Sequence, residues 1–191
     1  MKTLFASAAI LTLTAGTALA ADNSVIGDWL VKDGYANIRI DNCDGKMWGI
    51  VAWEKVPGGL DTENPDPARK TRLTLGMPVL LGLAPKEPNK WQGSIYNSQN
   101  GKTYSASISL ADENTLDLEG CLFTNFMCMT QQWTRVRIPP QNALPLPAVK
   151  GPATPPAKQV AAKKGAAPAA SDVCLRVAEE AAALEKTSAK K

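Results

Sequence analysis

Residues 102–110 alternate between polar and less polar side chains, and this alternation constrains the fold of the chain more than any other feature. The segment reads KTYSASISL, so its tyrosine, alanine, isoleucine and leucine fall on one face of an extended chain, and its threonine and serines on the other. A period of two is typical of a β-strand with one buried face. The pattern therefore predicts a strand that belongs to a half-buried sheet.

Other segments carry the same signal and are separated by residues that favour tight turns, such as Asp44-Gly45 and Asn100-Gly101. The other predicted strands are residues 26–32, 35–40, 46–54, 91–96, 116–119 and 130–137, while residues 79–83 are ambiguous. Residues 46–54 are apolar on both faces, as expected of a strand that is covered on both sides. Short strands without amphipathic helices between them favour an all-β fold, a small antiparallel barrel or sandwich.

The chain begins with the pattern of a secretory signal peptide over residues 1–20. Lys2 precedes an apolar stretch, and Ala18 and Ala20 form a small-residue cleavage pattern. An uncleaved membrane anchor is the alternative, but polar residues interrupt the apolar stretch, which is short for a spanning helix. We therefore expect a mature protein that is periplasmic or secreted, with no transmembrane segment after cleavage.

Composition divides the mature chain into two parts. Residues 21–138 carry 12 basic and 14 acidic residues, a net charge of −2, and form the predicted barrel domain. Residues 139–170 are mostly proline, alanine, lysine and glycine, so we expect a disordered linker, followed by a possible short helix over 171–191 that Ser171 would cap. The basic residues of this tail give it a net charge of +4. The negative domain, without a nucleic-acid-binding motif, argues against a nucleic-acid partner.

Two motifs at opposite ends of the domain suggest how a barrel could close. Gly27 and Trp29 open the first predicted strand, and Trp133 and Arg135 lie in the last. In lipocalin-like barrels such a tryptophan and a late arginine meet where the sheet closes, and the cation–π contact contributes on the order of 1 kcal/mol. The alternative is two unrelated core tryptophans and a surface arginine.

The motifs taken together resemble a family of exported bacterial proteins, the domain of unknown function 2147 (DUF2147). The matching positions are Gly27-Asp28-Trp29, Cys43, Gly49-Ile50-Val51, Asp61, Asn64-Pro65-Asp66, Arg72, Gly76, Trp91, Gly93, Ile95-Tyr96, Gly101-Lys102, Tyr104, Leu118, Gly120-Cys121, Cys128, Gln131, Trp133 and Arg135. The resemblance implies a small β-barrel of the calycin type, but no agreed activity. The chain departs from the family pattern at Trp48, where many members carry a cysteine that pairs with the one at position 43.

Four cysteines in an exported chain favour disulfide bonds over free thiols. Cys121 and Cys128 flank a short apolar loop, and we expect them to form a disulfide between one strand and the next. Cys43 then stays free or pairs with Cys174 in the tail. A zinc site of four thiolates is the competing reading, but no C-x-x-C spacing supports it. We expect neither a metal ion nor a cofactor.

The chain contains no histidine, which excludes histidine-dependent nucleophiles, general bases and zinc ligands. The acids that remain clustered for catalysis are Glu54, Asp61, Glu63 and Asp66. Pro65 and Pro67 make the segment around them a stiff loop, not a helix. We interpret Asp61 and Asp66 as structural residues that cap turns and pair with Arg69, Lys70 or Arg72, with an oxygen-rich calcium loop as the alternative.

The function predicted from these features is an exported, non-enzymatic β-barrel that binds a small molecule or a component of the cell envelope. Side chains fill most of a small barrel, which leaves room for at most one small ligand. The candidate ligand-binding residues are Trp53, Asp61, Asn64, Asp66, Arg72, Trp91 and Tyr96. Two alternatives stay open, namely an interaction protein that acts through its basic tail and a carboxylate-dependent enzyme.

Overall fold

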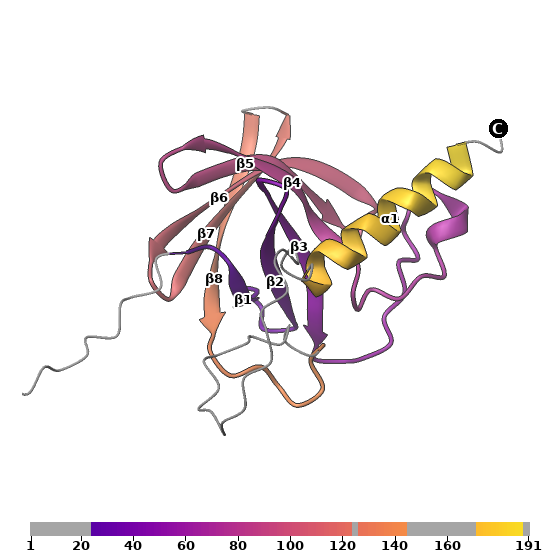
Figure 1. The fold of residues 1–191 in the computed structure, drawn as a ribbon, viewed down its shortest axis with the longest axis horizontal. Helices are drawn as coiled ribbons and strands as arrows, with labels where there is room; N and C mark the ends of the chain where they lie inside the picture. Colours follow the sequence, from indigo (N-terminus) through magenta and orange to yellow (C-terminus); the bar gives the residue numbers. More distant parts are fainter. Residues whose placement is uncertain (1–23, 124–125, 145–170, 189–191) are drawn as a thin grey trace, which may run out of the picture.

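The computed structural model describes residues 24–123, 126–144 and 171–188 of the chain, and it shows a closed antiparallel barrel with a helix on its outside (Figure 1). The strands are β1 (Gly27–Leu30), β2 (Ala36–Cys43), β3 (Lys46–Glu54), β4 (Pro78–Glu87), β5 (Lys90–Asn97), β6 (Lys102–Asp112), β7 (Thr115–Phe123) and β8 (Phe126–Val136). A 3-10 turn, η1 (Pro67–Arg69), and the helix α1 (Asp172–Ser188) complete the described elements. The all-β antiparallel barrel predicted from the sequence is confirmed.

Each strand pairs with the next one along the chain, and β8 pairs with β1 to close the barrel. The closure contact is the one that the two end motifs predicted. Trp29 lies opposite Arg135 in the β1–β8 register, and the Arg135 guanidinium carbon lies 4.2 Å from the centre of the indole ring. Arg135 also donates hydrogen bonds to the carbonyl oxygens of Ile26 and Glu113, so it ties three segments together.

The ambiguous segment 79–83 forms part of β4, and a β-bulge explains its mixed pattern. The register against β5 shifts between Leu81 and Ala84, next to Gly82, which has a φ of 58°. An extra residue at a bulge reverses the inward and outward phase of the strand. Leu80 and Leu83 therefore both lie fully buried although they are three residues apart.

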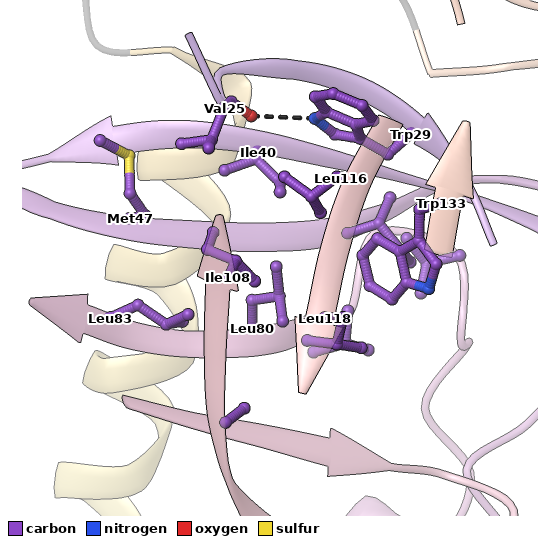
Figure 2. Packing of buried hydrophobic residues seen from close by; sticks show 14 of the residues in the cluster. Val25, Trp29, Ile40, Met47, Leu80, Leu83, Ile108, Leu116, Leu118 and Trp133 are labelled. Carbon is purple, nitrogen blue, oxygen red and sulfur yellow. Dashed lines mark hydrogen bonds between the residues drawn. The ribbon is translucent and has the colours of Figure 1, made fainter. Parts of the chain in front are cut away.

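One end of the barrel is filled by a packed apolar core (Figure 2). Its largest fully buried members are Trp29, Ile40, Leu80, Leu83, Ile108 and Leu116, together with Val25 from the segment before β1. The Trp29 indole donates a hydrogen bond of 2.9 Å to the carbonyl oxygen of Val25, so the one polar group of this side chain has a partner. Each such side chain contributes about 1.5–3 kcal/mol through burial.

The outside of the barrel at β2, β3 and β4 is covered by α1 (Figure 1). Val173 on α1 is fully buried, as are Ile50 and Ala52 on β3. The two-sided apolar pattern of β3 is explained by this arrangement, because its inner face meets the core and its outer face lies under the tail. Among the described residues, no helix is long and apolar enough to cross a membrane.

A disulfide and a buried ion pair fasten the start of α1 to the barrel. Cys43 at the end of β2 is bonded to Cys174, which resolves the open choice for Cys43. Arg39 on β2 is buried, and its guanidinium contacts Asp28 at 2.7 Å and Asp172 at 2.7 Å. Burial alone would lower the pKa of Arg39, but the hydrogen bond and charge of Asp28, aided by Asp172, more than offset it and raise the pKa.

The segment directly after β8 also lies against the barrel. Leu144 donates its backbone N–H to the carbonyl oxygen of Ala52 at 2.7 Å, and its own carbonyl oxygen accepts from Arg39. The predicted linker of residues 139–170 therefore begins with a described segment, residues 139–144, that contacts the barrel through Asn142 and Leu144. The rest of that linker and the predicted signal peptide lie outside the described residues.

Candidate functional site

The other end of the barrel is not filled but contains a cavity of about 970 Å³. Its apolar wall is formed by Val31, Ala36, Ile38, Val51, Val79, Ile95, Leu118 and Trp133. The packed core and the cavity lining share Ala36, Ile38, Val51, Val79, Tyr96, Leu118 and Trp133, so these side chains form the floor between the filled and the open half. A pocket of this volume, apolar with a few polar groups, has the size and character of a small-molecule site.

Gly120 on β7 helps to keep this half of the barrel open. A Cβ atom placed on Gly120 would meet only the Cγ2 atom of Ile95, at 3.9 Å. Gly49 in the filled half differs, because a Cβ there would lie 2.9 Å from the side chain of Leu80. The glycine of β7 therefore borders empty space, whereas the glycine of β3 allows close packing.

The mouth of the cavity carries exposed apolar side chains. Val56 is 79% exposed, Met127 65% and Met129 74%, and all three line the cavity. Tyr35 and Leu122 are also exposed lining residues. The β7–β8 hairpin that carries Leu122 and Met127 is joined at its base by the disulfide between Cys121 and Cys128, the pair expected from their spacing. Methionine side chains are unbranched and polarizable, so they adapt to ligands of different shape.

Polar side chains lie on the β5–β6 side of the mouth and on β8. Asn97, Asn100 and Tyr104 border the β5–β6 turn, and Gln131 lies on the wall beside Trp133. Glu54 and Lys55 lie at the end of β3, where Thr74 donates a hydrogen bond to the Glu54 carboxylate. These groups could orient the polar end of a ligand whose remainder occupies the apolar interior.

Beside the cavity, a buried polar network organises the loop between β3 and β4. Asp61 is fully buried and accepts hydrogen bonds from the Tyr96 hydroxyl at 2.6 Å and from the Asn64 amide at 2.6 Å. Arg72 donates to the same carboxylate at 2.8 Å. Burial, followed by the hydrogen bond and charge of Asp61, raises the pKa of Tyr96 to about 12, against the smaller opposing effects of Arg72 and Asn64. Every oxygen of Asp61 is therefore occupied within the protein.

The structure separates the seven candidate ligand-binding residues. Tyr96 alone among them lines the cavity, whereas Asp61, Asn64 and Arg72 form the network next to it. Asp66 caps η1 by accepting from the Ala68 N–H and lies 3.5 Å from Arg69. These contacts agree with the structural interpretation of the loop.

The two tryptophans proposed as ligand residues lie away from the cavity lining. Trp91 packs against the core from β5, opposite Ile108. Trp53 donates its indole N–H to Asn142 in the segment after β8. The reason is a register shift, because Asn37 pairs with Trp53 while Ile38 pairs with Val51, which leaves an extra residue in β3 and turns Trp53 to the outside.

The predicted acids do not converge on one cleft. Glu54 is at the cavity mouth, Asp61 is inside its network and Asp66 is at η1. Glu119 lies near Cys121 and Cys128, the one group of possible metal ligands within the described residues, but both sulfurs are consumed by the disulfide. This group therefore offers a single carboxylate, which is a poor basis for a metal site.

Sequence reasoning missed most of the residues that line the cavity. Leu118, Gly120 and Leu122 alternate along β7, and Met129, Gln131 and Trp133 alternate along β8, so the inward positions were readable from the period. The sequence carries no signal, however, that separates inward positions facing packed side chains from those facing empty space.

Comparison with known proteins identifies the family and the fold. A family model described as "Uncharacterized protein conserved in bacteria (DUF2147)" matches residues 27–135. Among solved structures, protein HP1028 from the human pathogen Helicobacter pylori, which is described as belonging to the lipocalin family, is similar with a TM-score of 0.55. The two chains are 19% identical, and the match covers 59% of this chain and 83% of the other. No curated protein matches the chain.

Proposed function

This chain belongs to the DUF2147 family of bacterial proteins, and we propose that it is an exported, non-enzymatic protein that binds a small, largely apolar molecule in the open half of its barrel. The observation that carries the proposal is the cavity of about 970 Å³ above a packed floor. A lipocalin-like fold supports it, because barrels of this size can hold one small ligand in their interior.

Export is supported by the signal-peptide pattern of residues 1–20 and by the cysteines. All cysteines of the described residues are in disulfides, Cys43 with Cys174 and Cys121 with Cys128. Disulfides persist in the periplasm and outside the cell but are rare in the reducing cytosol. An envelope component with an apolar part would meet the protein in that compartment.

A binding role is favoured over catalysis by the state of the carboxylates. Asp61 has no exposed surface and its oxygens are bonded to Tyr96, Asn64 and Arg72. Glycosidase-like chemistry needs two carboxyl groups that flank a substrate. Among the described residues, Glu54 is the carboxylate that lines the cavity, and it has no acidic partner there.

The proposal is tested by filling the cavity from Gly120. Gly120→Phe places an aromatic ring in the empty space, and Glu119→Phe places the same ring on the exposed position next to it. Binding is measured by the fluorescence increase of the neutral apolar probe N-phenyl-1-naphthylamine. We expect the wild type and Glu119→Phe to bind alike and Gly120→Phe to bind at least tenfold more weakly. Equal binding by a folded Gly120→Phe would overturn the proposal.

A further inference from the structure

We propose that the ligand of this cavity has a polar end that accepts hydrogen bonds, such as a carboxylate or a carbonyl group, and not one that donates them, such as an ammonium group. The inference rests on the proposed function, since it names the chemistry of the molecule that the cavity would hold. It is carried by the direction of the hydrogen bonds that the polar wall already makes.

Asn97 is a side chain whose oxygen is used within the protein and whose NH₂ group is left for the cavity. Its Oδ1 atom accepts a hydrogen bond of 2.9 Å from the backbone N–H of Gln99. Because a backbone N–H can only donate, the oxygen of the amide must face it, and the orientation of the amide is fixed. The Nδ2 group, which has no partner among the described residues, therefore remains as a donor at the cavity wall.

The same reasoning applies to Tyr104 through Asn100. Asn100 Oδ1 accepts from the backbone N–H of Lys102 at 3.1 Å, so its Nδ2 group must donate to the Tyr104 hydroxyl, at 2.9 Å. The hydroxyl oxygen is thereby used as an acceptor, and its proton is free to donate. Tyr104 lies opposite Ile95 and Asn97 lies opposite Lys102, so the two donors are diagonal neighbours on the same face.

Gln131 supplies a third donor on β8. Its Oε1 atom accepts from the indole N–H of Trp133 at 3.4 Å, and an indole nitrogen can only donate. The Nε2 group of Gln131 is therefore left for the cavity that this residue lines. Three polar side chains on two sides of the cavity thus use their oxygens internally and present N–H or O–H groups outward.

The charged residues at the mouth fit this assignment. Lys55 is exposed, lines the cavity and adds a further donor with a positive charge. Glu54 is the one charged acceptor in the lining; one of its oxygens accepts from Thr74, and the other is buried without a hydrogen-bond partner among the described residues. Asn97, Tyr104, Gln131 and Lys55 thus offer four donors at the cavity against this one unpartnered carboxylate oxygen. A ligand end that only donates would leave those donors without partners, which is costly away from water.

The test compares probes that share one chain and differ in the polar end. Dodecanoate, methyl dodecanoate and dodecylamine compete with N-phenyl-1-naphthylamine for the full-length wild type. We expect dodecanoate to bind at least tenfold more tightly than dodecylamine. Tight binding of methyl dodecanoate as well would assign the preference to the carbonyl acceptor, and weak binding of the ester would assign it to the anionic carboxylate; both results support an accepting end group.

A double variant replaces two of the donor groups by acceptors and keeps the hydrogen bonds that their side-chain oxygens accept within the protein. Asn97→Asp and Gln131→Glu keep the oxygens that accept from Gln99 and Trp133 but replace each free NH₂ group by an oxygen. The double variant should therefore prefer dodecylamine. The control Thr103→Asp with Thr130→Glu adds the same charges at exposed positions outside the cavity lining and should keep the wild-type preference.

The outcomes separate the two proposals. A wild type that binds the naphthylamine probe, but binds dodecylamine as tightly as dodecanoate, would overturn the donor assignment and leave the proposed function standing. An equal change of preference in the control variant would overturn it too, because the effect would then be one of net charge alone. A wild type that binds neither the naphthylamine nor any dodecyl probe would overturn both proposals.

Discussion

Replacing Asp61 with alanine should destabilise the barrel strongly, because this side chain is the common acceptor of a buried network. Removal of its carboxylate leaves the Tyr96 hydroxyl proton and one Nδ2 proton of Asn64 without their partner at 2.6 Å, while Asn64 keeps its hydrogen bond of 3.1 Å to the Tyr96 oxygen. An orphaned buried polar group costs about 1–3 kcal/mol. Arg72 is partly exposed and keeps its contact with Glu180, so it adds less.

The expected loss in the free energy of unfolding is about 3–5 kcal/mol, the range for breaking a buried pair by removal of one partner. Asp66 in the same loop provides a matched comparison. Its side chain is 35% exposed, caps η1 and pairs loosely with Arg69. Asp66→Ala should therefore cost about 1 kcal/mol, as is typical for loss of a capping side chain.

Both variants are compared with the wild type by equilibrium urea unfolding at neutral pH without reducing agent, followed by tryptophan fluorescence. The difference between the two midpoints, at equal slopes, gives the difference in stability. If Asp61→Ala unfolded at the same urea concentration as Asp66→Ala, the buried network would contribute no more to the free energy of unfolding than the exposed cap of η1 does. The loop would then have to be reconsidered as a binding element in which carboxylates are kept for a ligand.

Three further predictions concern the Tyr96 hydroxyl, the Cys43–Cys174 disulfide and the Arg135 side chain, each of which stabilises the fold. Burial and Asp61 raise the pKa of Tyr96 to about 12. The stability that the neutral Tyr96 hydroxyl contributes should therefore be complete at pH values below the usual tyrosine pKa and should be lost as the pH rises through 12. Urea titrations at alkaline pH should show this loss of stability in the wild type and not in Tyr96→Phe. Changing Cys43 and Cys174 to serine should lower stability by about 2–4 kcal/mol and increase amide exchange in α1 selectively. Arg135→Ala should cost about 1–3 kcal/mol, because it removes the contact with Trp29 and the hydrogen bonds to the carbonyl groups of Ser24, Ile26 and Glu113. Thermal unfolding should detect this loss.

The sequence predicted the barrel well because a closed antiparallel sheet repeats one local rule. The alternation of β6 and the turn at Asn100-Gly101 needed no distant partner to be recognised. Bulges broke this rule in β3 and β4, where an added residue reversed the phase. Such an insertion depends on how neighbouring strands are paired, so the outward position of Trp53 could not be predicted from its own segment.

The packing of α1 over β3 shows a second limit of prediction from the sequence. Its apolar outer face correctly implied that something must lie over it, but nothing near it in the sequence identified α1 as that element. The contact joins residues more than a hundred positions apart through Arg39, Asp172 and the Cys43–Cys174 bond. The cavity was not predictable for a related reason, since empty volume depends on the sum of side chains from five or more strands.

The Cys43–Cys174 disulfide changes the covalent connectivity of the tail. The bond closes a covalent ring that runs along the chain from Cys43 to Cys174, and residues 145–170 belong to that ring. A partner that recognises this stretch must accept a looped ligand and cannot thread over a free end. A backbone cut anywhere within it would give two polypeptides that remain one molecule for as long as that sulfur–sulfur bond is oxidised.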